Sequence, residues 1–279
     1  MHRATYNGDA AGLIPAVVGV VERAGRVIQE VRGSAMEIAQ KDGDQGPVTR
    51  ADREADALLK TELLKLVPAA WLSEETADDH ARLGAERIWI VDPLDGTKDF
   101  VAGIPEYSVA VALVERGEPV LGVVHNPATG EMVWAVRGAG CWSGETGNGK
   151  RETVGEGSRL LASRSETKRG EFKPFESGWE VVPVGSIQYK LAMVAVGKGA
   201  VTVSRGPKHE WDVCAGALLV KEAGGVVSEA LGGPLAYNRP RPKVAGILAG
   251  APTAYTKLLG IVKRVGASER MAELDRGVA

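Results

Sequence analysis

Apolar residues recur at helical spacing in two segments near the N-terminus. Between about Leu13 and Val31 this spacing predicts one helix, and Pro15 is tolerated because it lies in the first turn. A polar stretch from Gln40 to Pro47 interrupts the pattern. Thr49 then suits the N-terminal cap of a second helix. The predicted apolar faces consist of Ile14, Val17, Val18, Val21, Ile28 and Val31 in the first helix and of Ala55, Leu58, Leu59, Leu63 and Leu66 in the second.

Short apolar runs separated by Gly- and Pro-containing turns follow, and they predict strands at Ile88–Val91, Tyr107–Val114, Val120–Val124 and Met132–Val136. The segment from Ser143 to Ser158 is rich in Gly, Glu and Ser, which indicates a boundary between two halves. Beyond it we expect alternating elements: strands near 160–162, 181–183, 200–203 and 246–249, and helices near 186–196 and 212–222. The pattern predicts an α/β (α+β) fold with two subdomains, residues 1–150 and 151–279.

The composition is that of an ordinary globular chain. Its 279 residues are enough for a substantial core, and 44% are hydrophobic and 25% charged. A formal net charge of −2 gives no electrostatic reason to expect a nucleic-acid partner. Cys141 and Cys214 are the only cysteines, too few for a disulfide scaffold, so a cytoplasmic protein is expected. No apolar run has the length of a membrane span, and no secretory signal is evident.

Two aspartates, three positions apart, come directly after the predicted strand Ile88–Val91. Between Asp92 and Asp95, Pro93 fixes one backbone dihedral angle, and Gly96 permits a positive φ. We therefore expect a sharp turn at the end of this strand. An aspartate-rich turn without any ligand is one interpretation of the segment, because Asp, Pro and Gly are common turn residues.

A metal and phosphate site is the other interpretation. In such a turn the carboxylates of Asp92 and Asp95 and the carbonyl of Leu94 can converge on one point. Hard oxygen ligands of this kind suit Mg²⁺, which keeps several waters and binds phosphate oxygens. The amides around Gly96 and Thr97 would open a helix, whose N-terminus favours a phosphate.

Four segments, which occur along the chain in the same order as in the family, resemble the motifs of the inositol monophosphatase superfamily. Asp92–Phe100, which reads D-P-L-D-G-T-K-D-F, resembles the signature D-P-x-D-G-T-x-x-F. Pro47–Asp52 resembles the first motif, and Ser73–Glu75 resembles the acidic motif before the signature strand. Glu210–Gly216 with Glu222–Gly225 resembles the motif W-D-x-A-x…E-A-G-G.

The resemblance implies a Mg²⁺-dependent phosphomonoesterase with a layered αβαβα fold. Asp52 and Thr97 would activate the attacking water, with Glu74 helping to orient it. Gly96 and Thr97 would also contact the substrate phosphate. Two or three ions would be held by the carboxylates of Glu74, Asp92, Asp95 and Asp212 and by the carbonyl of Leu94.

The resemblance implies that a position seven residues before Asp212 bears on substrate choice. Inositol-preferring members of the family commonly have a glutamate there, whereas this chain has Arg205. An arginine cannot accept a hydroxyl hydrogen, but its planar fork suits a second phosphate. Arg205, together with Gly185, Ser186 and Lys190, resembles the substrate-binding residues of the 3'(2'),5'-bisphosphate nucleotidase branch, although the arginine directly precedes Gly206 with no intervening residue. The resemblance implies hydrolysis of adenosine 3',5'-bisphosphate to AMP.

Two alternatives stay open at this point. One is an inositol monophosphatase, or a related sugar or histidinol phosphatase, because a fold and a metal site do not fix the substrate. The other is a binding protein that contacts the transcription machinery, as proposed for some bacterial relatives. As an enzyme the protein would act on a small phosphate ester, as a monomer or homodimer, and lithium would inhibit it.

Overall fold

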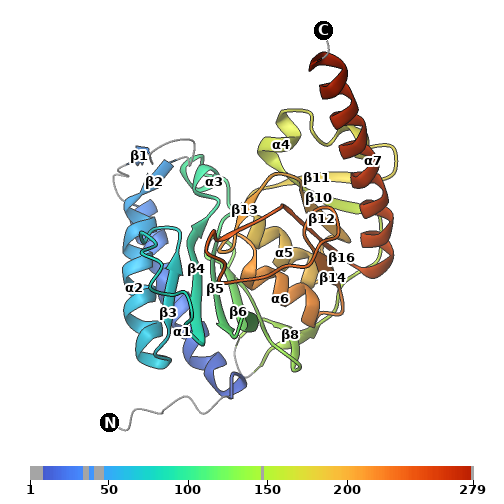
Figure 1. Ribbon diagram of the computed structural model, residues 1–279. Helices are drawn as coiled ribbons and strands as arrows, with labels where there is room; N and C mark the ends of the chain where they lie inside the picture. The colour runs from blue at the N-terminus through green and yellow to red at the C-terminus, as the bar shows by residue number, and fades with distance from the viewer. Residues whose placement is uncertain (1–8, 34–37, 41–46, 146–147, 278–279) are drawn as a thin grey trace.

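The computed structural model describes residues 9–33, 38–40, 47–145 and 148–277. Residues 41–46 of the polar stretch predicted at Gln40–Pro47 lie outside the described residues. A short 3₁₀ turn, η1 (Ala11–Leu13), leads into α1 (Ile14–Arg32), which packs beside α2 (Arg50–Leu66) (Figure 1). β1 (Ile38–Gln40) and β2 (Pro47–Thr49) form a small antiparallel pair before α2. Both helices predicted from the apolar spacing are confirmed.

The larger sheet has seven strands. Its order follows the chain, and only the first pair, β3 with β4, is parallel. A short helix, α3 (Thr97–Val101), connects β4 to β5. The strands are β3 (Ala70–Ser73), β4 (Arg87–Asp95), β5 (Ser108–Glu115), β6 (Glu118–Asn126), β7 (Glu131–Val136), β8 (Gly140–Ser143) and β9 (Lys150–Glu152).

The second sheet has five strands in the order β11-β10-β12-β16-β14, with β10 parallel to both neighbours and β16 antiparallel to β12 and β14. A separate two-stranded ribbon pairs β13 with β15. The strands are β10 (Arg159–Ser163), β11 (Glu180–Val184), β12 (Val201–Ser204), β13 (Lys208–His209), β14 (Val226–Ser228), β15 (Lys243–Val244) and β16 (Ile247–Gly250). The remaining helices are α4 (Arg164–Lys168), the 3₁₀ turn η2 (Lys173–Phe175), α5 (Ile187–Ala195), α6 (Cys214–Glu222) and α7 (Pro252–Gly277).

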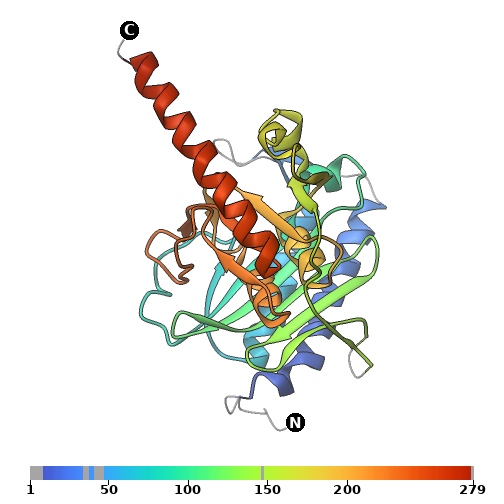
Figure 2. The ribbon, with the colours of Figure 1, turned by 90° about the vertical axis from the view of Figure 1, so that its right-hand side faces the viewer.

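Helices and sheets alternate in five layers, which confirms the predicted αβαβα arrangement. In Figure 1, α1 and α2 cover one face of the larger sheet, α5 and α6 lie between the two sheets, and α7 lies outside the second. Apolar side chains of β4 point alternately to the two faces of the sheet, which explains why the sheet needs a helix layer on each side. Trp89 and Val91 pack with the α1/α2 side, whereas Ile88 and Ile90 pack with the α5/α6 side. Figure 2 shows α7 crossing the second sheet.

The structure differs from the sequence-based expectations in the length of one strand and in several short elements that were not predicted. β4 was expected to end at Val91 but continues to Asp95, because its pairing with β5 shifts register between Asp92 and Asp95 and so accommodates Pro93. The segment expected to separate the halves contains β9, which pairs with β8, while the boundary at residue 150 stays a prediction. The periodicity analysis missed the short elements β3, β8, β13, β14, β15 and α4 and most of α7.

The described helices include none that combines the length and the apolar character needed to cross a bilayer.

Candidate active site

The ends of two parallel strands place the first acidic residues together. β3 ends at Ser73, which is paired with Val91, so Glu74 and Asp92 follow at the same edge of the sheet. The Glu74 amide donates to the Val91 carbonyl at 3.4 Å. Asp56 of α2 accepts a hydrogen bond from Ser73 Oγ at 2.5 Å, which ties this edge to the outer helix layer. Local pairing therefore determines where both carboxylates lie.

The register shift in β4 determines how the aspartate loop turns. Asp92 pairs with Ala110 and Asp95 with Ser108, so one extra residue is accommodated on β4. Asp92 Oδ1 accepts from the Leu94 amide at 3.1 Å inside this bulge. Gly96 then adopts a φ of 94°, which side-chain-bearing residues resist, and α3 begins at the next residue. The predicted sharp turn and the helix opening after it are confirmed.

Asp52 and Thr97 meet through a hydrogen bond. Thr97 Oγ1 lies 3.1 Å from Asp52 Oδ1 and 3.1 Å from the Leu94 carbonyl oxygen, and its single proton can be donated to either. The other oxygen, Asp52 Oδ2, accepts from Thr49 N and from Thr49 Oγ1, both at 2.7 Å. This capping box at the start of α2 fixes the carboxylate, and Asp52 is buried at 1% exposure. The hydroxyl of Thr97 therefore has an oriented proton acceptor.

Glu74, Asp92 and Asp212 form a three-carboxylate cluster. One oxygen of each lies within 4.8 Å of the others. Asp212 comes from the opposite half of the molecule, where a tight turn presents it: its Oδ2 accepts from the His209 amide at 2.7 Å. The turn is anchored by buried Glu210, which accepts from two backbone amides of the 238–239 loop at 2.7 and 2.9 Å. Asp212 is not the N-cap of α6, which begins at Cys214.

The electrostatics of the cluster favour a cation. Burial, followed by the nearby carboxylates of Asp95 and Glu74, raises the pKa of Asp212 to about 7. Burial also raises the pKa of Asp95, against the opposing effects of Ser186, Gln188 and two lysines. Grouped acidic side chains that resist ionisation in this way are balanced by a bound positive charge. Three carboxylates offering only oxygen fit a hard divalent cation such as Mg²⁺, so the residues present fit the predicted metal.

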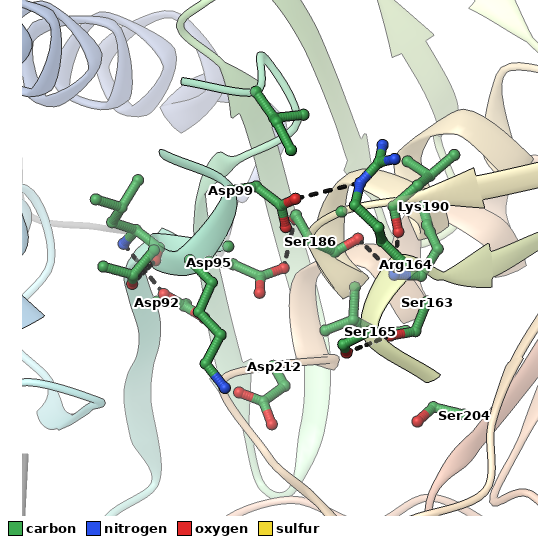
Figure 3. A pocket seen from close by; sticks show the side chains of 18 of the residues that line it. Asp92, Asp95, Asp99, Ser163, Arg164, Ser165, Ser186, Lys190, Ser204 and Asp212 are labelled. Atoms are coloured by element: carbon green, nitrogen blue, oxygen red, sulfur yellow. Dashed lines mark hydrogen bonds and ion pairs between the residues drawn. The ribbon is translucent and has the colours of Figure 1, made fainter. Parts of the chain in front are cut away.

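Asp95 lies beside the cluster and is held from the other half of the molecule. Its Oδ2 accepts from Ser186 Oγ and from the Gln188 amide, both at 2.6 Å. Both donors belong to the start of α5, so the bonds join the aspartate loop of β4 to the second half (Figure 3). Because both bonds end on Oδ2, the other oxygen is left for a ligand.

A cavity of about 510 Å³ connects these groups. Figure 3 shows Asp92, Asp95 and Asp212 on one side and Arg164, Lys190 and the serines of the second half on the other. Of the predicted site residues, ten line it: Glu74, Asp92, Leu94, Asp95, Gly96, Thr97, Gly185, Ser186, Lys190 and Asp212. Asp52 reaches the site through Thr97, whereas Arg205 does not line the cavity.

Lys190 is deeply buried, and it lines this cavity. Its Nζ donates to the carbonyls of Ser186 at 3.0 Å and Val184 at 3.2 Å. Burial lowers the pKa of Lys190 to about 8, against the raising effect of Asp95. Its contacts therefore fix the Val184–Ser186 segment.

Several cavity residues were missed by the sequence analysis. They are Lys98, Asp99, Ser163, Arg164, Ser165, Lys168, Ser204 and Lys208. Lys208 stands four positions before Asp212 and acts electrostatically on both Asp95 and Asp212. The available signal was the S-R-S sequence directly after the strand predicted at 160–162, since strand ends commonly present binding groups.

Comparisons with known proteins show which proteins the whole chain is similar to. The model of the family described as inositol monophosphatase family matches residues 9–266. A fructose-1,6-bisphosphatase/inositol-1-monophosphatase of Thermotoga maritima is 31% identical over 221 residues, which cover 76% of this chain and 82% of that protein. The 3'(2'),5'-bisphosphate nucleotidase CysQ of Salmonella typhimurium is 35% identical over 234 residues, covering 81% and 94%. The structure of the extragenic suppressor protein suhB from Bartonella henselae matches with a TM-score of 0.77 and 29% identity, covering 90% of this chain and 98% of that one.

Proposed function

The chain belongs to the inositol monophosphatase family, whose members hydrolyse phosphate monoesters, and from this premise we propose that it is a Mg²⁺-dependent 3'(2'),5'-bisphosphate nucleotidase. The proposed reaction converts adenosine 3',5'-bisphosphate and water to AMP and phosphate. The observation that carries the proposal is the charge distribution of the cavity, whose lining combines a carboxylate cluster with several cations, among them Arg164, Lys168 and Lys208.

The carboxylates of Glu74, Asp92, Asp95 and Asp212 and the carbonyl of Leu94 are the proposed ligands of two or three Mg²⁺ ions. The ions would neutralise charge on the reacting phosphate and promote ionisation of water. Thr97 Oγ1 can donate its proton to Asp52 Oδ1 and keep a lone pair directed to the site, where it accepts a proton from the attacking water. We assign this proton relay to Thr97 and Asp52, with Glu74 orienting the water.

The cations in the lining suit a second anionic group. Lys168 is exposed, and Lys208 is about a quarter exposed, its Nζ lying 4.0 Å from Glu166 Oε1. A monophosphate of an uncharged sugar has no group that would use these charges, whereas the 5'-phosphate of the bisphosphate does. Gly185 and Ser186 also line the cavity. We propose that Lys208 contributes to this selectivity beside Arg205, which sequence spacing alone indicated.

The inositol monophosphatase alternative keeps specific support. A relative of that name from Rhizobium meliloti is 34% identical over 239 residues, comparable to the nucleotidase relatives. The serine hydroxyls of the second half, Ser163, Ser165 and Ser204, could bind sugar hydroxyls. For a purely binding protein, the intact carboxylate set offers no support, because binding a protein partner does not need it.

A substrate panel tests the proposal. Purified protein with saturating Mg²⁺ is assayed for phosphate release from adenosine 3',5'-bisphosphate, AMP, inositol 1-phosphate, fructose 1,6-bisphosphate and histidinol phosphate. We expect the highest kcat/KM for adenosine 3',5'-bisphosphate, with AMP as the product. Preference for inositol 1-phosphate would contradict the nucleotidase assignment and leave the metal site standing, whereas no hydrolysis of any ester would contradict both.

A further inference from the structure

Glu106 connects the two halves of the molecule next to the active site, although it does not line the cavity. It belongs to the loop between α3 and β5. Its Oε2 accepts from the Gly185 amide at 2.7 Å and makes a very short contact with Arg164 Nη2. Arg164 also pairs with Asp99, its Nε lying 3.3 Å from Asp99 Oδ1. The carboxylate of Glu106 is thus bound to the segment that leads into α5.

The backbone at Gly185 and Ser186 is held in a conformation that the local sequence does not favour. Ser186 has φ 51° and ψ 126°, in a region that L-residues rarely adopt. A Cβ on Gly185 would lie 2.5 Å from Asp99 Oδ2 and 2.6 Å from the Glu106 carbonyl oxygen. Only glycine permits this close approach. The strain at Ser186 therefore needs outside contacts, and the hydrogen bond from the Gly185 amide to Glu106 is one of them, beside the bonds that Lys190 Nζ donates to the Ser186 and Val184 carbonyls.

Proton counting defines what Ser186 does in this conformation. Its Oγ has one proton and two lone pairs, and it meets Asp95 Oδ2 at 2.6 Å, the Tyr189 amide at 2.9 Å and Ser108 Oγ at 3.0 Å. An ionised Asp95 can only accept and the Tyr189 amide can only donate. The Ser186 proton is therefore committed to Asp95, and Ser108 supplies the third hydrogen bond.

We propose that Glu106 is a positioning residue for the metal ligand Asp95. By holding the Gly185 amide, it keeps Ser186 in the strained conformation from which the hydroxyl orients Asp95 toward the cavity. Groups that orient a metal ligand typically change metal affinity 10- to 100-fold when they are removed. The inference rests on the proposed metal site but not on the identity of the substrate.

Mn²⁺ binding, measured by electron paramagnetic resonance and by isothermal titration calorimetry in the absence of substrate, tests the assignment. Glu106→Ala removes the acceptor, and Ser186→Ala removes the donor to Asp95. We expect each to weaken Mn²⁺ binding by about 10- to 100-fold. If both act through one path, Glu106→Ala should add little to Ser186→Ala in the double variant. Glu106→Gln keeps an oxygen for the Gly185 amide, so its loss should be smaller.

Glu115 offers a matched control at the far end of β5. It pairs with Arg87 at 2.7 Å, and its side chain is 22% exposed, against 24% for Glu106. Glu115→Ala removes a similar ion pair and should leave Mn²⁺ affinity unchanged.

The outcomes separate the inference from the proposed function. Wild-type affinity in folded Glu106→Ala, or full additivity in the double variant, would overturn the positioning role. Should Glu106→Ala not fold, wild-type affinity in both Ser186→Ala and Glu106→Gln would overturn it equally. A wild-type protein that binds no Mn²⁺ would overturn the proposed metal site and this inference with it.

Discussion

Replacing Thr97 by alanine removes the hydroxyl that connects Asp52 to the cavity. The 3.1 Å hydrogen bond to Asp52 Oδ1 is lost, while the two bonds from Thr49 to Asp52 Oδ2 are kept. The capping box of α2 therefore stays intact, and the loss of one hydrogen bond should cost only about 1 kcal/mol of stability. Any large effect of this substitution must then come from the chemistry of the site.

A positioned proton acceptor typically contributes about 10²- to 10⁴-fold to the rate, which is roughly 3 to 5 kcal/mol of transition-state stabilisation. We expect Thr97→Ala to lower kcat within this range and to leave KM for the ester almost unchanged. Thr97→Ser keeps a hydroxyl at the same position and should restore most of the loss. Asp52→Asn should lower kcat to a similar extent, because the amide is a much poorer proton acceptor than the carboxylate.

Steady-state kinetics of phosphate release by the two single variants and the double variant complete a thermodynamic cycle. If Asp52 and Thr97 act as a unit, the double variant should lose little more than the worse single variant. Thermal unfolding of each variant controls for stability. Additive losses in ln kcat, or full turnover by Thr97→Ala, would refute the relay.

Three further predictions follow from other parts of the molecule. Lys208→Met should raise KM for adenosine 3',5'-bisphosphate by about 10- to 150-fold and hardly affect KM for inositol 1-phosphate, as expected for a charge-assisted contact of about 1.5–3 kcal/mol. The same measurement on Arg205→Ala shows which cation binds the second phosphate. An equal rise in KM for both esters would contradict a specificity role. Burial lowers the pKa of His125 to about 4, below that of the unfolded chain, so its contribution to stability is complete above about pH 6.5 and is lost progressively as the pH falls toward 4. Denaturant unfolding should show that the free energy of unfolding falls by about 3 kcal/mol over this pH range. A His125→Gln variant with the same pH dependence would contradict the assignment of this effect to His125. Lithium should inhibit phosphate release in an uncompetitive or mixed manner with respect to the ester, because we expect Li⁺ to replace a weakly held Mg²⁺ after phosphate cleavage. Purely competitive kinetics would contradict this expectation.

Local patterns predicted the parts of the site that local geometry determines. Asp92, Asp95, Gly96 and Thr97 follow one strand, and the turn that places them depends on Pro93 and on a glycine with positive φ. Asp212 and Ser186 were predicted from their resemblance to motifs of the family. Their distance to the aspartate loop could not be predicted from the sequence, because it depends on how the second half packs on the first.

Other parts of the site depend on contacts between residues distant in the sequence. Arg205 was proposed from its spacing to Asp212, but β12 ends at Ser204, and in this part of the chain the cation that lines the cavity is Lys208 on β13. Glu106 had no signal, because an acidic residue in a loop usually faces water, and its partners Arg164 and Gly185 lie 58 and 79 positions away. Nor could periodicity detect a two-residue strand such as β13, which exists because of its pairing with β15.

The Mg²⁺ dependence of phosphate release from adenosine 3',5'-bisphosphate, compared between the wild type and Asp95→Asn, tests the central claim most directly. The substitution keeps the shape of the side chain and removes one negative charge from the proposed metal site. The account predicts that wild-type hydrolysis disappears in excess chelator and returns with added Mg²⁺, and that Asp95→Asn needs far more Mg²⁺ and turns over far more slowly. Wild-type hydrolysis that persists in excess chelator, or an Asp95→Asn variant with the wild-type Mg²⁺ requirement and turnover, would contradict it.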